Sequence, residues 1–418
     1  MNSSQTKSEL HRQKRLEWRR RQAAAAAATS TIHIPHDLIK EVFAFLPAKS
    51  LVRLKCVNKQ FNSSISDPTF IQMHFNRSSR NMMLLHTKMD SWKWKVCQNM
   101  CRSSYATALV FTGMINKSSI NVTLTKNFYY QLNDRHRECR HVIGSCNGLL
   151  CLFFCSSNNR NHWWLCVWNP ATRTLSDKFG YCPGEYLGCE FNFTFGYDNL
   201  SDTYKVVLFL PHVMNVKVLN LKDKVWRDVQ DSPVAHYHRP KKLKFVHLSD
   251  SVNWLVICNY FGNFFNYDYK DISIEQFAII SLDLRSETHA KLSPPQGFNE
   301  VPFRMPYLSV LNDCLCFSHD FKQTHFIIRQ MKEFGVEESW TQFLKISYHN
   351  LRIYCRPYFR LFPLCLLKKN DTIVLTSKHL RRAILYNWRD NTTRRINKPS
   401  WFRYDGKLDY VESLFSYC

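Results

Sequence analysis

The amino-acid sequence predicts a small all-α domain followed by a large all-β domain. Apolar residues recur with a helical period between residues 31 and 78, and from residue 79 onward they alternate with the two-residue period of strands. At 418 residues, with 45% hydrophobic and 14% aromatic content, the chain is long enough to bury one large core and one small one. We therefore expect two folded domains, residues 31–78 and 79–418.

Residues 1–30 precede both domains and are polar and basic, with a run of alanines at their end. The segment offers few apolar side chains to pack, so we expect a disordered tail, which either targets the nucleus or acts as a spacer. No run of apolar residues is long enough for a membrane span, and the first residues lack the apolar region of a signal peptide. We expect the protein in the cytoplasm or the nucleus, with no membrane partner.

The net charge and the cysteines restrict the function further. Lys and Arg number 57 against 33 Asp and Glu, which gives a formal net charge of +24. Such a charge suits a nucleic acid, an anionic surface or an acidic protein. Outside residues 11–21 the basic residues alternate with apolar strands, which is typical of a solvated surface, so we do not expect a nucleic-acid partner. The 16 cysteines contain no C-x-x-C pair, which indicates buried thiols and no zinc site.

The first helix is expected to begin at residue 35 or 36 and to end at Leu46. Pro35 suits the first turn of a helix, Asp37 adds negative charge at the positive end of the helix dipole, and Pro47 pushes Leu46 out of the helical region. Apolar side chains cover an arc of about 160°, wider than the roughly 100° stripe of a helix with one buried surface.

A second helical stretch is expected after Ser50, which is placed to cap it. Its apolar residues form one main stripe and a second, smaller surface: Leu51, Leu54, Val57, Phe61 and Ile65, with Val52 and Cys56 opposite. A segment of about 45 residues is close to the lower limit for a self-sufficient core. One apolar surface must be covered from outside, either by another protein or by the β-domain of this chain.

The β-domain repeats one pattern of an apolar strand, a polar turn and a second strand. The turns are marked by Thr125, Asn169, Asn220, Asp283, Gln330 and Asn387. Their spacing of about 50 residues suits four-stranded blades arranged radially. We predict a β-propeller of about six blades, with residues 408–418 as a strand that closes the ring. A β-sandwich is the alternative, because it also contains short strands at regular spacing.

The stretch "IPHDLIKEVFAFLPAKSLVRLKCVNKQFNSSISDPTFIQMHF" resembles an F-box, over residues 32–75. It has the proline near the start, Leu-Pro after helix one, Lys-Ser-Leu, Cys-Val and Ser-Asp-Pro-x-Phe. Two positions depart, because Asn58 stands where the family usually has Cys and Phe61 where it usually has Trp. Downstream, "GSCNGLLCLF", "VWNPATR" and "FTFGYDNLSDTYKVV" are similar to the F-box-associated domain of plant F-box proteins, including the S-locus-like group. The Gly-Gly pairs of true kelch repeats are missing.

This resemblance implies a substrate-recognition subunit of an SCF-type (Skp–cullin–F-box) ubiquitin ligase. The F-box would bind a Skp-type adaptor, and through it cullin and RING subunits. The β-domain would bind an unidentified protein target for ubiquitination and proteasomal degradation. Such a receptor acts by raising local concentration, so we expect no enzymatic activity, no cofactor and no metal. The residues that match the adaptor-facing positions of the motif are Pro35, Leu38, Ile39, Val42, Leu46, Pro47, Leu51, Val52 and Val57.

Target recognition is expected from loops at one end of the propeller, because loops vary on a rigid scaffold. The loops of most unusual composition are residues 155–163, 230–243 and 260–270. Aromatic and arginine side chains are typical interface anchors, although each of them also suits the closing of a blade. The candidates for target binding are Trp163, His236, Tyr237, Arg239, Phe265 and Tyr267.

Two other classes of function are alternatives to a ligase receptor. An enzyme built on a propeller would need a convergent set of titratable groups, and the chain contains none of the common catalytic motifs. An adaptor-independent interaction scaffold would bind RNA through the basic tail. A salt-dependent RNA-binding assay on a chain without residues 1–30 discriminates this scaffold from the receptor.

Overall fold

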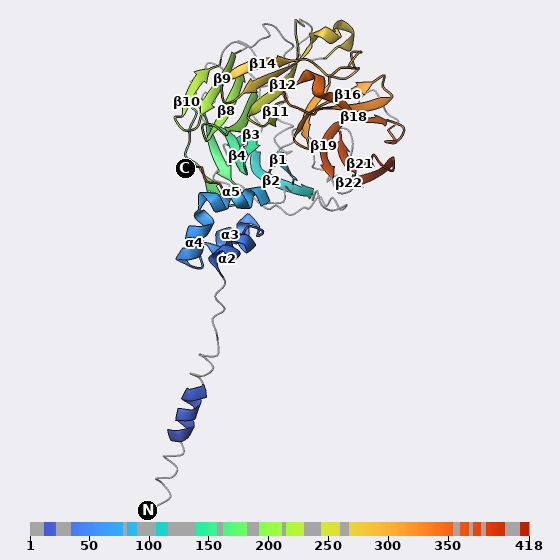
Figure 1. Ribbon diagram of the computed structural model, residues 1–418. Helices are drawn as coiled ribbons and strands as arrows, with labels where there is room; N and C mark the ends of the chain where they lie inside the picture. Colours follow the sequence, from blue (N-terminus) through green and yellow to red (C-terminus); the bar gives the residue numbers. More distant parts are fainter. Residues whose placement is uncertain are drawn as a thin grey trace, which may run out of the picture.

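A computed structural model describes most of the chain, with helices first and strands after them (Figure 1). The described residues are 12–21, 35–77, 82–89, 106–115, 139–156, 162–181, 192–210, 215–229, 244–259, 267–353, 360–367, 371–377, 382–397 and 410–417.

The helical domain contains α2 (His36–Phe43), α3 (Ala48–Leu54), α4 (Lys59–Ser66) and α5 (Pro68–Arg77). Helix α2 begins where predicted, with Pro35 at its N-cap and Asp37 in its first turn. It ends at Phe43 rather than at Leu46. The chain turns between these two residues, and Pro47 becomes the N-cap of α3 with an extended backbone. The proline therefore starts the next helix as well as stopping the first.

The predicted second helix is in fact two helices. Ser50 lies inside α3 and does not cap it, because α3 already begins at residue 48. The stripe from Leu51 to Ile65 is interrupted at Asn58, which has an extended backbone and caps α4 by accepting a hydrogen bond from the Phe61 N–H at 2.7 Å. Asn and Asp are preferred at N-caps because their side chains satisfy the unpaired N–H groups of the first turn.

Residues 12–21 form a helix in which every side chain is exposed. This differs from the disordered chain that we expected for the tail. The segment is rich in Arg, Lys, Gln, Leu and Glu, which are strong helix formers. Local propensity accounts for this helix, since its side chains contact no core.

In the part of the chain that the structure describes, five four-stranded sheets follow, and each is a meander of four consecutive antiparallel strands. A two-stranded sheet of β1 (Met82–Met89) and β2 (Ala106–Ile115) precedes them. Radial repetition of such sheets confirms the β-propeller, and the two-sheet sandwich is excluded. The strands of the five sheets are β3 (Cys139–Cys146), β4 (Leu149–Cys155), β5 (Trp163–Asn169) and β6 (Thr174–Leu175); β7 (Asn192–Asp198), β8 (Thr203–Leu210), β9 (Asn215–Asn220) and β10 (Val225–Asp228); β11 (Val246–Leu248), β12 (Ser251–Ile257), β13 (Phe277–Asp283) and β14 (Thr288–Leu292); β15 (Tyr307–Leu311), β16 (Cys314–Phe321), β17 (His325–Met331) and β18 (Trp340–Ser347); β19 (Phe362–Leu367), β20 (Thr372–Thr376), β21 (Arg382–Asn387) and β22 (Thr392–Asn397).

The same hydrogen-bonded turn connects the third strand to the fourth in four of these sheets. Asn169, Asn220, Asp283 and Asn387 each end the third strand of their sheet. In each case the side-chain oxygen accepts a backbone N–H two or three residues further on, at 2.7 to 3.3 Å. This is the Asx turn, and it explains why the repeat was visible in the sequence. Gln330 lies one residue before the end of β17, and Thr125 lies outside the described residues.

The segment Tyr410–Tyr417, which we call the strap, is not a strand, so the predicted closing strand is wrong. Its hydrogen bonds go to turns instead of to a strand ladder. Asn169 Nδ2 donates to the backbone oxygens of Ser413 and Phe415 at 3.1 and 2.7 Å. The Tyr417 hydroxyl donates to the Leu221 oxygen at 2.9 Å. The strap therefore joins the β3–β6 sheet to the β7–β10 sheet.

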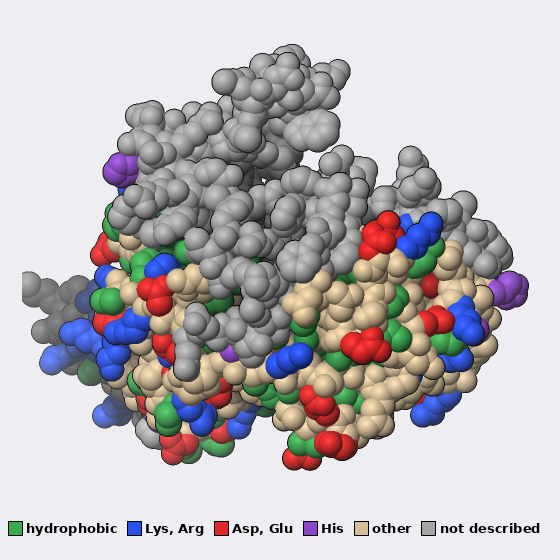
Figure 2. All heavy atoms as spheres, turned by 90° about the horizontal axis from the view of Figure 1, so that it is seen from above, with side chains coloured by type: hydrophobic (Ala, Val, Ile, Leu, Met, Phe, Trp, Pro, Cys, Tyr) green, Lys and Arg blue, Asp and Glu red, His purple; other side chains and the backbone are tan. Residues whose placement is uncertain are grey.

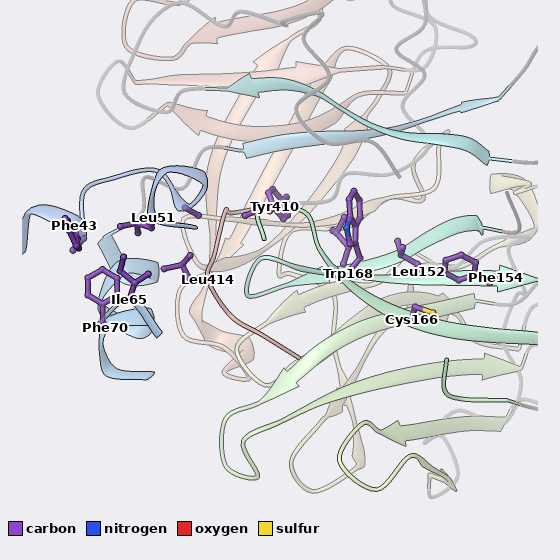
Figure 3. Packing of buried hydrophobic residues seen from close by; sticks show 14 of the residues in the cluster. Phe43, Leu51, Ile65, Phe70, Leu152, Phe154, Cys166, Trp168, Tyr410 and Leu414 are labelled. Atoms are coloured by element: carbon purple, nitrogen blue, oxygen red, sulfur yellow. The ribbon is translucent and has the colours of Figure 1, made fainter. Parts of the chain in front are cut away.

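One apolar core runs from the helical domain through the strap into the β3–β6 sheet. It contains Leu51 and Phe70 from the helices, Tyr410 and Leu414 from the strap, and Trp168 from β5. Figure 3 shows the two strap residues between the helical residues and Trp168. The Phe75 and Phe415 rings add an edge contact at 5.3 Å. One of the two apolar surfaces of the helical domain is thus covered by this chain itself.

Stability is expected to fall with acidification through buried His319. This residue is 2% exposed, and burial lowers the pKa of its imidazole to about 4. The unfolded chain binds a proton near pH 6.5, where the folded state stays neutral. Stability is therefore complete above pH 6.5 and declines between pH 6.5 and 4, by up to about 1.4 kcal/mol per pH unit. Urea unfolding measures how the free energy of unfolding changes with pH. Between pH 6.5 and 4 this change should be smaller for His319→Phe than for the exposed control His349→Phe, and equal changes would contradict the prediction.

Candidate functional site

An apolar surface of the helical domain is exposed to solvent. Leu38, Val42, Phe45 and Val57 are 56%, 62%, 74% and 62% exposed. They come from α2, from the turn after it and from the turn after α3. Exposed large apolar side chains gathered on one small domain are typical of an interaction site. We call these four residues the helical face.

The helical face stays exposed because the opposite sides of the same helices are the ones that are buried in this chain. Phe43, Ala48 and Leu51 point into the core that the strap and the β3–β6 sheet complete. Ile39, Leu46, Val52 and Leu54 are half-buried and pack against that core. Because α2 has a wide apolar arc, burying one side leaves the other in water.

The adaptor-facing residues predicted from the motif divide into three groups. Leu51 is fully buried in the core of this chain, so its assignment to a partner surface is wrong. Spacing alone did not show which side of the second helical stretch would face the β-domain. The exposed members are Pro35, Leu38, Val42, Pro47 and Val57, and the half-buried members are Ile39, Leu46 and Val52.

Phe45 belongs to the face, although the motif did not point to it. Its place in the apolar arc of helix one is the signal that could have identified it. The guanidinium of Arg77 lies 5.3 Å from the centre of its ring, and the same guanidinium forms an ion pair with Glu41. The hydrogen bond from Arg77 lowers the pKa of the Glu41 carboxyl. These contacts orient Phe45 at the edge of the face.

The two departures from the usual motif both have a structural role. Asn58 caps α4, as described above. The Phe61 ring packs edge-on against Phe43, with ring centres 5.0 Å apart. A phenyl ring in place of an indole therefore still contributes to the core beneath the helical face.

Replacing the Asn58 cap should destabilise the helical domain. Asn58→Ala removes the bond to the Phe61 N–H, and we expect the free energy of unfolding to fall by about 1 kcal/mol. Asn58→Ser keeps a capping oxygen and should restore most of this loss. Thermal unfolding of the three proteins measures the effect. Equal stability of Asn58→Ala and the unchanged chain would contradict this role.

Comparison with known families shows what this combination of domains is. Residues 32–72 match the F-box domain, and residues 86–417 match the F-box associated beta propeller domain. The chain belongs to the F-box-associated β-propeller family. Similar curated proteins from Arabidopsis thaliana include the F-box/kelch-repeat protein At3g23880, 25% identical over 75% of this chain and 79% of its own length, and the F-box protein CPR1, 23% identical over 75% and 73%. F-box domains bind Skp-type adaptors in general, and proteins of this kind are typically non-catalytic.

The predicted target-binding residues of this F-box protein lie in different environments. Trp163 is 1% exposed and its ring contacts Phe153 and Phe193, so it fills a blade and its assignment to target binding is wrong. Strand β5 is buried on both sides, which the sequence pattern did not show. Tyr267 is half-buried and donates a hydrogen bond to the Pro302 oxygen at 2.7 Å, which fixes its loop. His236, Tyr237, Arg239 and Phe265 lie outside the described residues.

A polar hollow between α2 and α4 contains a close serine–histidine pair. His36 Nε2 lies 2.5 Å from Ser64 Oγ, but the Ser64 hydroxyl donates to the Gln60 backbone oxygen at 2.9 Å. The imidazole must then donate to the hydroxyl, which is the reverse of what activates a nucleophile. On the other side, the Gln60 amide faces His36 Nδ1 at 3.5 Å, where a catalytic triad would place a carboxylate. The contact between His36 and Ser64 is therefore structural, and it joins α2 to α4.

The structure also bears on metals, membranes and charge, within the described residues only. They contain no group of three or more His, Cys, Asp or Glu side chains arranged for a metal, and no helix long and apolar enough to cross a membrane. Figure 2 shows one face of the molecule, on which basic and acidic side chains of the described residues are interspersed.

Proposed function

We propose that this chain is the substrate-recognition subunit of an SCF-type ubiquitin ligase. The helical face would bind a Skp-type adaptor, which links the chain to cullin and RING subunits. The propeller would hold a protein target for ubiquitination and proteasomal degradation. The observation that carries the proposal is an exposed apolar face on the domain that matches the F-box.

The four residues of the helical face supply only part of the free energy of a stable complex. Full burial of a large apolar side chain contributes about 1.5 to 3 kcal/mol. Four side chains that are already partly covered would contribute roughly 4 to 8 kcal/mol, and association costs about 4 to 15 kcal/mol. The half-buried Ile39, Leu46 and Val52 must add to the contact. Because the four side chains alone do not exceed this cost, each residue of the face should matter to binding.

The contact between the two domains supports the role of a positioning subunit. The strap and the shared core hold the helices against the β3–β6 sheet through Leu51, Leu414 and Trp168. A receptor of this kind needs no chemistry of its own. It raises the concentration of target lysines near the ubiquitin-conjugating enzyme, and a fixed geometry makes that concentration effective.

Co-expression with a plant Skp-type adaptor tests the proposal. We expect a one-to-one complex by size-exclusion chromatography with light scattering, stable at physiological salt because the contact is apolar. A chain that elutes free of adaptor under these conditions would contradict the proposal. We also propose that the protein acts in the cytoplasm or nucleus, and imaging of a fluorescent fusion tests this placement.

The exposed basic helix favours one second candidate, an adaptor-independent scaffold that binds RNA. Over residues 12–21 the helix exposes six basic side chains and a single carboxylate: Arg12, Lys14, Arg15, Arg19, Arg20 and Arg21, with Glu17. If this candidate is correct, RNA affinity will fall steeply with salt and will be lost when residues 1–30 are deleted. RNA binding that is unaffected by the deletion would contradict it.

A further inference from the structure

Three residues of the helical face form one row along α2 and the turn after it. Leu38 and Val42 are four residues apart in α2, and side chains at this spacing are neighbours on a helix surface. Phe45 follows in a tighter turn, in which its backbone N–H donates to the Val42 oxygen at 3.2 Å. Side chains three residues apart in such a turn lie one above the other. The Phe45 ring therefore extends the row beyond the end of α2.

Phe45 is the most exposed residue of the helical face, at 74%, and Arg77 limits the motion of its ring. The Arg77 guanidinium lies 5.3 Å from the centre of this ring. A cation within about 6 Å of an aromatic face is attracted by the quadrupole of the ring. An exposed ring without such a contact would exchange freely among its rotamers. Arg77 therefore restricts the orientation of the Phe45 ring before any partner binds.

Two contacts between helices hold Arg77 beside the Phe45 ring. The guanidinium forms an ion pair with Glu41, which lies in α2 within the same turn of helix as the start of the tighter turn. The imidazole of His74, also in α5, donates a hydrogen bond to the Leu46 oxygen at 2.8 Å. This bond ties the residue after Phe45 to the helix that carries Arg77. The position of the guanidinium relative to the ring is thus fixed from both helices.

We infer that Arg77 is a positioning residue for adaptor binding, which holds the Phe45 ring in the orientation that an apolar recess of the Skp-type adaptor receives. The inference rests on the proposed function, in which the helical face binds this adaptor. Aromatic side chains are typical anchors of an interface, and a side chain that is already ordered loses less entropy on binding. Because Glu41 pairs with the guanidinium, docking beside it brings no unpaired charge into the contact.

A purely structural role of Arg77 makes a different prediction. The residue lies in the last turn of α5, where a cation suits the negative end of the helix dipole, and its ion pair joins α5 to α2. A structural role would act through folding stability, whether or not the Phe45 ring is present. A positioning role changes adaptor affinity only while the ring is there to be positioned. A double-mutant cycle between the two residues distinguishes these roles.

Isothermal titration calorimetry of the full chain with a plant Skp-type adaptor measures this cycle. We expect Phe45→Ala to weaken binding at least about ten-fold, because it removes the anchor. Arg77→Gln should weaken binding about five-fold in the unchanged chain, and less than about two-fold in a chain that already carries Phe45→Ala. Arg77→Lys should retain most of the affinity, because an ammonium is also attracted to the face of the ring.

The matched control is Arg227→Gln, which removes another exposed, ion-paired arginine, here from the propeller. It should leave the adaptor affinity unchanged, and thermal unfolding of the two Arg→Gln variants should be alike, since exposed ion pairs contribute little to stability. Equal losses from Arg77→Gln with and without the Phe45 ring, or no loss in either chain, would overturn this inference while the adaptor complex and the proposed function stand. If the unchanged chain binds no adaptor, the proposed function fails and the inference fails with it.

Discussion

Replacing Val42 by Asp is expected to abolish stable association with a Skp-type adaptor. Val42 lies in α2 at the helical face and is 62% exposed, so the charge is tolerated in the free chain. In a complex it would bury an unpaired carboxylate, which costs at least about 3 kcal/mol, or more than 100-fold in the dissociation constant. Isothermal titration calorimetry of the purified chain with the adaptor measures this change.

Leu200→Asp is the control for this substitution. Leu200 is 70% exposed in the turn between β7 and β8, so the same kind of change is made at an exposed apolar residue outside the helical domain. We expect wild-type affinity from this variant. If Val42→Asp binds as well as Leu200→Asp does, the helical face is not the adaptor-binding surface.

Replacing Asn169 by Ala is expected to destabilise the protein by about 3 kcal/mol. This side chain is 2% exposed and makes four hydrogen bonds. Its oxygen accepts from the N–H groups of Ala171 and Thr172, and its amide donates to the two strap carbonyls. A buried hydrogen bond contributes about 1 kcal/mol, and the groups left behind would be buried without partners.

The variant Asn220→Ala measures what the turn alone contributes to stability, without the hydrogen bonds from Asn169 to the strap. Asn220 closes the equivalent turn of the next sheet, where its oxygen accepts from Lys222 N–H and the Thr203 hydroxyl. Among the described residues its side chain has no hydrogen bond to the strap, which contacts this turn through the Leu221 oxygen instead. We expect a loss of about 1 to 2 kcal/mol for this variant. Urea unfolding compares the two proteins. Equal losses would show that the strap adds nothing to stability.

The parts of the fold that could be predicted from the sequence are those with a local cause. Pro35 and Asp37 fix the start of α2 through backbone geometry and charge within a single turn. Asn169, Asn220, Asp283 and Asn387 mark blade turns because each side chain bonds to its own turn. The propeller could be predicted because this Asx turn recurs from sheet to sheet.

The parts that could not be predicted depend on residues far apart in the chain. Leu51 and Val52 are neighbours in an apolar helix, and Leu51 is buried because it belongs to a core shared by the other helices, the strap and the β3–β6 sheet. Trp163 is apolar enough for either an interface or a core, and its burial follows from Phe193 of the next sheet. The strap reads as a strand in the sequence, but its carbonyls accept hydrogen bonds from Asn169. In each case the contact, and not the residue type, determines the environment.

In the proposed function, this one chain connects a target to a ubiquitin ligase. Quantitative mass spectrometry of proteins captured from proteasome-inhibited plant cells, comparing the unchanged chain with Val42→Asp, tests it most directly. We expect the unchanged chain to capture the adaptor, the cullin and a target in its ubiquitinated form. The variant should capture the same target without the ligase subunits and without the ubiquitin. Capture of the ubiquitinated target by both proteins, or absence of the adaptor and cullin from the unchanged chain, would contradict the claim.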